Sequence, residues 1–225
     1  EFPGVPLEGP SDMYLGPGYS EQAVESALAQ SKLTFARPER LVEVAAKLVE
    51  KGMVVGLFQG RMEFGPRALG NRSILADPRK ADMKDLVNSV VKQREAFRPF
   101  APAVLEERAG EYFEGCVRSR FMISTYRVPP VKAEVIPAVT HVDGTARVQT
   151  VPRDSNPFYY DVIEAFGRLT GVPVVLNTSY NVKGEPIVES PSDAIRCFYG
   201  TGIDALVIPP FLVAKRPAAE ILRAR

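Results

Sequence analysis

The chain has 225 residues, of which 45% are hydrophobic, so it can bury one sizeable core, and a disordered chain is excluded. Its 28 basic and 27 acidic residues nearly cancel, which excludes an overall electrostatic field that would favour nucleic acid or a membrane surface. One histidine and two cysteines without C-x-x-C spacing are too few for a zinc site of the usual kind. We therefore expect no metal site in this chain and a reducing, cytoplasmic environment.

The start of the chain has the composition of a linker. Residues 1–10 are rich in proline and glycine, and the sequence begins without methionine, so residues 1–13 are expected to connect to a missing N-terminal domain. Residues 14–225 are expected to form one domain. No apolar run is long enough to span a bilayer and no signal-peptide pattern is present, so no membrane partner is expected.

Helical and strand periodicities alternate along the chain and predict an α/β (α+β) fold with a twisted, partly antiparallel sheet flanked by helices. Ser20 is the expected N-cap of the first helix, and Pro38 is expected in the first turn of a second helix that Gly52 ends. The predicted helices cover 21–30, 38–51, 82–92, 156–170 and 192–199, with a further helix ending near Phe113. The predicted strands cover 53–58, 73–76, 101–105, 121–128, 172–176 and 205–208.

Residues 139–151 predict a β-hairpin with Asp143 and Gly144 at its tip. In this register one face is polar and suits a ligand cleft. His141 falls on the opposite, apolar face and is interpreted as a structural histidine rather than a catalyst. The polar face carries Thr140, Thr145, Arg147 and Gln149.

Residues 60–67 follow a predicted strand and have the glycine spacing of a phosphate-binding loop, although they lack the Lys-[Ser/Thr] pair of a Walker A loop. A plain turn is the alternative. Between Gly60 and Arg98, nine basic residues oppose five acidic ones, which makes this segment +4 and the rest of the chain −3. The concentration of charge beside the glycines favours an anion site.

Two further stretches carry candidate ligand groups. Lys92 and Arg94 end a predicted helix, where the helix dipole alone favours cations. Arg98 lies in the stiff, apolar segment 97–102 and needs a fixed anion, which could be an internal carboxylate or a phosphate. Residues 176–181 place small polar side chains at the end of a buried strand, where they form either a turn or a ligand site.

Residues 60–74, 94–102, 140–149 and 176–181 together resemble the C-terminal domain of the NodU/CmcH-type O-carbamoyltransferases. This resemblance extends from about Tyr14 onward and implies a fold similar to that of YrdC-type threonylcarbamoyl-adenylate synthases. Their Lys-x-Arg signature resembles Lys92-Gln93-Arg94, and their Ser-Thr-x-x-Asn signature loosely resembles residues 178–181.

The resemblance implies that the domain binds ATP, with Mg²⁺, and carbamoyl phosphate, and forms carbamoyl-adenylate. In such proteins an N-terminal actin/Hsp70-like domain with metal-binding histidines then carbamoylates a hydroxyl acceptor. That domain and its metal are not in this chain, so acceptor transfer is not expected here. Lys92 and Arg147 are the candidate catalytic residues. The candidate ligand-binding residues are Arg67, Lys92, Arg94, Arg98, Thr145, Arg147, Asn177, Thr178 and Ser179.

Two hypotheses from other classes compete with this interpretation. The +4 segment could bind RNA, but only Phe64, Phe97 and Phe100 interleave its basic residues, and stacking platforms need more exposed aromatic side chains. Nucleic acid is therefore disfavoured. The domain could also be a non-catalytic regulatory module that binds a nucleotide without activating carbamoyl phosphate.

Overall fold

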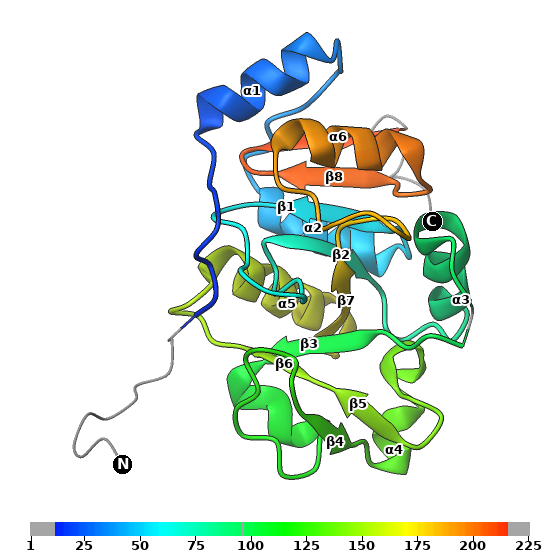
Figure 1. The fold of residues 1–225 in the computed structure, drawn as a ribbon. Helices are drawn as coiled ribbons and strands as arrows, with labels where there is room; N and C mark the ends of the chain where they lie inside the picture. The colour runs from blue at the N-terminus through cyan, green and yellow to red at the C-terminus, as the bar shows by residue number, and fades with distance from the viewer. Residues whose placement is uncertain (1–11, 96, 216–225) are drawn as a thin grey trace, which may run out of the picture.

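A computed structural model describes residues 12–95 and 97–215 (Figure 1). Its centre is one mixed sheet with the strand order β6-β3-β7-β2-β1-β8-β9. The β1/β8 and β3/β6 pairs are parallel and the remaining pairs are antiparallel. The strands are β1 (Val55–Phe58), β2 (Arg72–Ala76), β3 (Ala101–Leu105), β6 (Gln149–Val151), β7 (Val174–Ser179), β8 (Ala205–Ile208) and β9 (Phe211–Ala214).

Helices cover both faces of this sheet (Figure 1). On one face α2 packs on α5, and on the other lie α1, α3 and α6. A two-stranded sheet of β4 and β5 continues the molecule beyond β6. The remaining elements are α1 (Glu21–Gln30), α2 (Leu41–Glu50), α3 (Met83–Val87), β4 (Thr125–Arg127), α4 (Pro130–Ala133), β5 (Thr145–Arg147), α5 (Pro157–Thr170) and α6 (Pro191–Gly200), with a π-helix at Asn88–Lys92 and 3-10 helices at Glu106–Glu111 and Pro137–Val139.

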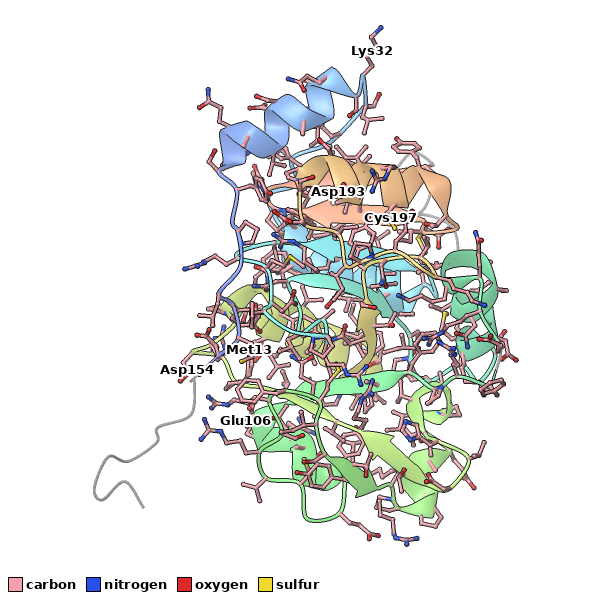
Figure 2. All side chains as sticks on the ribbon, in the orientation of Figure 1. Met13, Lys32, Glu106, Asp154, Asp193 and Cys197 are labelled. Atoms are coloured by element: carbon pink, nitrogen blue, oxygen red, sulfur yellow. The ribbon has the colours of Figure 1, made fainter. Side chains whose placement is uncertain are left out.

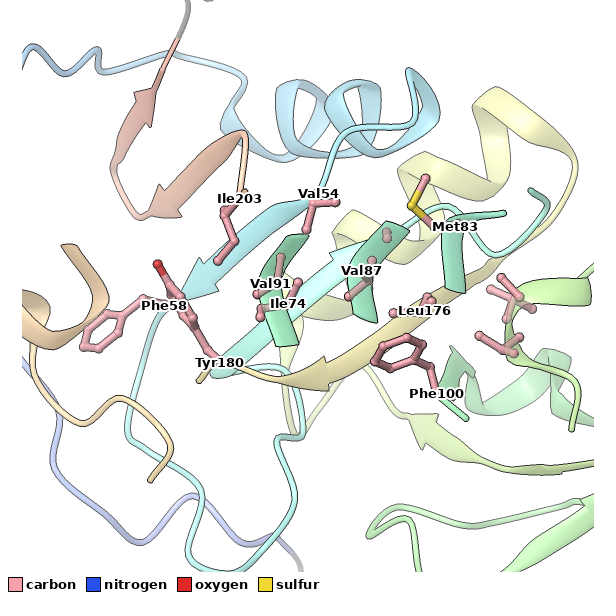
Figure 3. Close-up of a cluster of buried hydrophobic side chains, with 14 of the residues drawn as sticks. Val54, Phe58, Ile74, Met83, Val87, Val91, Phe100, Leu176, Tyr180 and Ile203 are labelled. Atoms are coloured by element: carbon pink, nitrogen blue, oxygen red, sulfur yellow. The ribbon is translucent and has the colours of Figure 1, made fainter. Parts of the chain in front are cut away.

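The central strands are apolar on both sides because both faces are covered. Neighbouring residues of a strand point to opposite faces, so Ile74 and Leu176 belong to one core, whereas Leu75 and Val175 belong to the other. Figure 3 shows the first core, in which Val87 and Val91 of the α3 region pack over β2 and β7. This explains why continuous apolar runs, rather than alternating patterns, predicted these strands.

The predicted second helix starts later than expected. Pro38 lies outside α2, which begins at Leu41. The reason is a contact made by the preceding chain, because Ala36 exchanges two backbone hydrogen bonds of 2.9 Å with Leu212 of β9. This pairing holds the chain extended up to the proline, and the helix forms only after the turn at residues 39–40.

The predicted hairpin over residues 139–151 is wrong. Gly144 does turn the chain, donating its N–H to the His141 carbonyl at 3.0 Å. However, β5 pairs with β4, which places Arg147 opposite Thr125, and β6 pairs in parallel with β3. One part of the prediction is confirmed: side chains alternate between two faces, and Ala146 and Val148 point into the core. Nonlocal partners satisfy the backbone of this segment better than a local hairpin does.

The structure also places β9, which the periodicities did not predict, and shortens the predicted strand 121–128 to β4. Among residues 12–95 and 97–215, no helix is both long and apolar enough to cross a membrane.

The linker prediction for residues 1–13 falls almost entirely on residues 1–11, outside the described part. Within the described part of this stretch, Met13 packs near Leu69.

Gly70→Ala is expected to destabilise the protein by more than roughly 2 kcal/mol. Gly70 has a φ of 109°, and an added Cβ would lie 2.1 Å from Cδ1 of Tyr159 on α5. Urea unfolding measures the loss. Gly144→Ala is the matched control, since its φ is 74° with nothing within 4 Å, and it should cost only about 1 kcal/mol. Equal losses in both variants would show that the Tyr159 contact is unimportant.

Candidate functional site

The loop between β1 and β2, residues 59–71, is organised around one buried carboxylate. Glu63 is 2% exposed, and its Oε1 accepts backbone N–H groups from Leu69 at 2.7 Å, Asn71 at 2.6 Å and Arg72 at 3.2 Å. Three hydrogen bonds to one ionised oxygen hold the returning half of the loop, since charge-assisted bonds of this kind are strong. The other oxygen, Oε2, is buried without a hydrogen-bond partner.

Arg72 completes the base of this loop. Its side chain is fully buried and donates hydrogen bonds to the carbonyls of Gln59 at 2.8 Å and Pro17 at 3.2 Å. The guanidinium also stacks 3.7 Å from the ring centroid of Phe58. Burial lowers its pKa to about 10, and nearby Glu63 opposes this shift, so the group stays charged at neutral pH. Arg72 therefore supports the loop from inside and cannot face a ligand.

Lys92 is held in a cage of neutral oxygens. The side chain is 3% exposed, and its Nζ donates to Oδ1 of Asn181 at 2.8 Å, the Asn181 carbonyl at 3.0 Å, the Ser179 hydroxyl at 3.3 Å and the Ser179 carbonyl. Burial, and to a smaller extent the charge of Arg94, lowers the pKa of Lys92 to about 7. Asn181, which was not among the predicted site residues, is thus a principal partner of the predicted catalytic lysine.

The predicted arginines form one electropositive group. Burial and then the charge of Arg98 lower the pKa of Arg94, to which Arg147 adds a further lowering. Burial and then the charge of Arg67 lower the pKa of Arg147. These shifts connect Arg67, Arg94, Arg98 and Arg147, which come from three separate parts of the chain. The four side chains are called the arginine cluster below.

The members of the arginine cluster differ in how their side chains are held, and Arg67 is the exposed member at the loop tip. Arg94 is fixed, because its Nε donates to Oδ1 of Asn88 at 2.7 Å and its guanidinium lies 4.8 Å from the Phe100 ring centroid. Arg98 is half exposed and forms an ion pair with Glu95 at 3.1 Å. Of the two anions that the sequence allowed for Arg98, the structure therefore shows the internal carboxylate. Arg147 is half buried, and its Nε is buried without a hydrogen-bond partner.

Two hollows meet at the tip of the 59–71 loop. The smaller one, of about 370 Å³, is lined by Arg67 and Arg147 together with apolar side chains that include Met13 and Phe64; it is called the arginine hollow below. The larger one, of about 910 Å³, extends from Asn181 to the start of α6. Gly65 and Pro66 line both hollows, so the loop tip is the wall between them.

Asn177 braces the same loop from the sheet. Its Nδ2 donates to Oε1 of Gln149 at 2.8 Å and to the Ala68 carbonyl at 3.2 Å, while Nε2 of Gln149 donates to the Leu69 carbonyl at 2.8 Å. Both amide hydrogens of Asn177 are therefore used within the chain, and its Oδ1 is buried without a partner. As a ligand group, this side chain can only offer an acceptor.

The remaining predicted side chains occupy supporting positions. The Thr145 hydroxyl donates to Oδ1 of Asp143 at 2.7 Å and lies 3.3 Å from Nδ1 of His141. Burial lowers the pKa of His141, and the structural role of this histidine stays a prediction. Thr178 lies opposite Ile74 of β2. Among the described residues, no group of three or more His, Cys, Asp or Glu side chains could hold a metal ion.

Comparison with known proteins shows the family of this chain. Residues 46–215 match the family model described as "Carbamoyltransferase C-terminus", which covers the loop, the lysine cage and the arginine cluster. The chain belongs to this family. It is 53% identical over 221 residues to nodulation protein NolO of Bradyrhizobium diazoefficiens, and the match covers 96% of this chain and 40% of NolO. This member of the carbamoyltransferase family therefore spans less than half of the length of that relative.

Solved structures confirm the YrdC-like fold. The chain resembles full-length HypF in its phosphate- and nucleotide-bound form, with a TM-score of 0.53 and 17% identity over 81% of this chain and 22% of HypF. It also resembles P. abyssi Sua5 complexed with L-threonine, with a TM-score of 0.52 and 16% identity over 74% of this chain and 46% of Sua5. At these identities the similarity establishes the arrangement of helices and strands and nothing beyond it.

Glu63→Gln is expected to lower the free energy of unfolding by roughly 1–3 kcal/mol, because the neutral amide weakens three hydrogen bonds and removes the charge near buried Arg72. Urea denaturation provides the measurement. Glu25→Gln, on the exposed surface of α1, makes the same chemical change and should leave the unfolding midpoint unchanged. A Glu63→Gln variant as stable as the parent would contradict the role assigned to this carboxylate.

Proposed function

We propose that this chain binds ATP and carbamoyl phosphate between the 59–71 loop, the Lys92 cage and the arginine cluster, and forms carbamoyl-adenylate there. ATP, carbamoyl phosphate and water give carbamoyl-adenylate, pyrophosphate and inorganic phosphate. Carbamoyl phosphate is first hydrolysed to carbamate and phosphate, and a carbamate oxygen then bonds to the α-phosphorus of ATP as the bond to pyrophosphate breaks. Transfer to a hydroxyl acceptor is assigned to another part of the full-length protein.

The observation that carries this proposal is the uncompensated positive charge. Arg147 lies close enough to lower the pKa of Arg94, and Arg67 lies close enough to lower that of Arg147. The Lys92 ammonium is surrounded by neutral oxygens. Placing cations together costs stability unless an anion offsets the repulsion. A nucleoside triphosphate beside an acyl phosphate supplies several negative charges. Mg²⁺ bound to the nucleotide would neutralise part of the negative charge that the basic side chains do not offset.

The site can act mainly by positioning and electrostatics. Phosphoryl-centre displacement needs the reacting groups held in line and the developing charge stabilised by fixed donors. Arg67 and Arg147 line the arginine hollow and supply such donors there. The larger hollow is lined by Glu185, Glu189 and Asp193, so the phosphate groups are assigned to the arginine hollow. In this proposal Arg147 and Arg67 contact the transferring group, and Lys92 holds the end of β7 beside it.

Pyrophosphate release tests the proposal. The purified chain is incubated with ATP, Mg²⁺ and carbamoyl phosphate, and pyrophosphate is expected only when all three are present. Nucleotide binding without pyrophosphate release would favour a non-catalytic regulatory domain. Salt-sensitive retention of RNA without nucleotide binding would favour an RNA-binding module, the second alternative.

Arg147→Ala is expected to lower the rate of carbamoyl-phosphate-dependent pyrophosphate release by roughly 100-fold or more, the usual effect of deleting one charge-stabilising donor. Arg127→Ala is the matched control, because Arg127 is an exposed arginine on the adjacent strand β4. The control should retain the parent rate. Comparable losses in the two variants, or a lower melting temperature that accounts for the loss, would remove Arg147 from the reaction.

ATP affinity is expected to be highest at or below pH 7 and to fall as the pH rises toward 9. The pKa of Lys92 is about 7 in the free protein, and a bound anion favours the ammonium form and so raises this pKa. Binding above pH 7 therefore takes up a proton, and affinity decreases by up to about tenfold per pH unit. Calorimetric titration at several pH values measures this dependence.

Lys92→Met should abolish that pH dependence between pH 7 and 9, because the titrating group is gone. Lys84→Met, in the same helical segment, should keep the slope of the parent protein. An unchanged slope in the Lys92→Met variant would assign the proton uptake to another group.

A further inference from the structure

Residues 12–18, called the strap below, run along the outside of the 59–71 loop. Figure 1 shows this segment in dark blue at one side of the molecule, leading up to α1, and Figure 2 places Met13 at that edge. Backbone hydrogen bonds join the two segments. The Gly16 N–H donates to the Met62 carbonyl at 2.9 Å, the Met62 N–H to the Pro17 carbonyl at 2.8 Å, and the Phe64 N–H to the Met13 carbonyl at 2.7 Å.

Arg61 clamps the strap from the loop side. Its Nε donates to the Gly16 carbonyl at 2.9 Å and its Nη2 to the Leu15 carbonyl at 2.7 Å. These two parallel donors use the fork of the guanidinium, which a lysine cannot reproduce. Arg61 belongs to the +4 segment, yet its donors are directed at the backbone of the strap and not at either hollow.

The strap also forms part of the arginine hollow. Met13 lines the hollow together with Phe64, Arg67 and Arg147. The next residue, Tyr14, donates its hydroxyl to the Leu69 carbonyl at 2.9 Å and accepts from Nδ2 of Asn156 at 2.9 Å. The strap is thus joined to the loop on both sides of its tip, at residues 61–64 and at residue 69.

The loop tip, residues 64–67, has little other support. All four residues are exposed, and Gly65 has a φ of 129° with no neighbouring atom within 4 Å of the position of a Cβ. Glu63 fixes the returning half of the loop, at residues 69–72, through its three accepted N–H groups. Phe64, the first residue of the tip, is bound by the strap through its own N–H.

We propose that the strap is a positioning element of the ligand site: it sets the orientation of the loop tip and so holds Arg67 beside Arg147. This inference deepens the proposed function and rests on it for the identity of the ligand. The contact between strap and loop is independent of that function, because it consists of backbone hydrogen bonds that can be measured in the free protein.

Gly16→Ala tests the strap with the smallest change. A Cβ at this position would lie 2.9 Å from both Cβ and the carbonyl oxygen of Met62, so the two segments must separate. We expect the dissociation constant for ATP to rise about tenfold, the effect of losing about 1.4 kcal/mol of binding free energy, and hydrogen exchange to accelerate at the amides of Gly16, Met62 and Phe64. Gly110→Ala is the matched control, since its nearest neighbour would be 3.8 Å away, and it should change neither quantity.

Arg61→Lys distinguishes positioning from direct attraction of the ligand. The lysine keeps the positive charge but loses the two-pronged clamp, so it should weaken ATP binding nearly as much as Arg61→Met. Full recovery of affinity by Arg61→Lys would show that Arg61 acts through its charge and would overturn the proposal. Unchanged affinity together with unchanged exchange in Gly16→Ala would overturn it as well.

Failure of the proposed function would be visible separately. If the parent chain binds no ATP, the proposed function fails, and the strap is then judged by hydrogen exchange at the amides of Arg67 and Ala68. Faster exchange there in Gly16→Ala, but not in Gly110→Ala, would support the strap as the element that holds the tip. Unchanged exchange at these amides would reject it.

Discussion

The rest of the site depends on the hydrogen bonds that the Glu63 carboxylate accepts from the backbone at the end of its own loop. By accepting three backbone N–H groups, this carboxylate forces the 59–71 loop to return on itself between two central antiparallel strands. This return brings Gly70 against Tyr159 and places Arg72 under the loop, where its guanidinium meets carbonyl groups and the Phe58 ring. A glycine-containing loop would otherwise sample many conformations, and its returning half, from Leu69 to Arg72, would not be fixed against the sheet.

The basic residues of the chain divide into two groups with different tasks. Arg61 and Arg72 donate to backbone carbonyls and build the loop. Arg67 and Arg147 line the arginine hollow, and neighbouring positive charge lowers the pKa values of Arg94 and Arg147, which costs stability in the free protein. Functional sites tend to hold charge that the fold does not need, which supports our proposal that this cluster receives an anion.

The loop tip has a central place in this arrangement because it separates the two hollows and carries Arg67. Its position is decided on one side by the sheet, through Asn177 and Gln149, and on the other side by the strap. In the proposed function this partition would separate the arginine hollow from the larger hollow, which Glu185, Glu189 and Asp193 line, and would help to keep water from the reacting groups. The family match covers the loop and the sheet but begins after the strap.

The amino-acid sequence by itself determined the layered α/β fold, because continuous apolar runs and helical spacing are local patterns that burial on both faces preserves. Its long motifs also determined the family. The tertiary structure alone decided what each charged residue does. Arg61, Arg67 and Arg72 look equivalent in the sequence, yet one holds the strap, one faces the arginine hollow and one is buried. The hairpin over residues 139–151 failed for the same reason: the partners of β5 and β6 lie elsewhere in the chain, and backbone groups pair wherever the whole fold satisfies them.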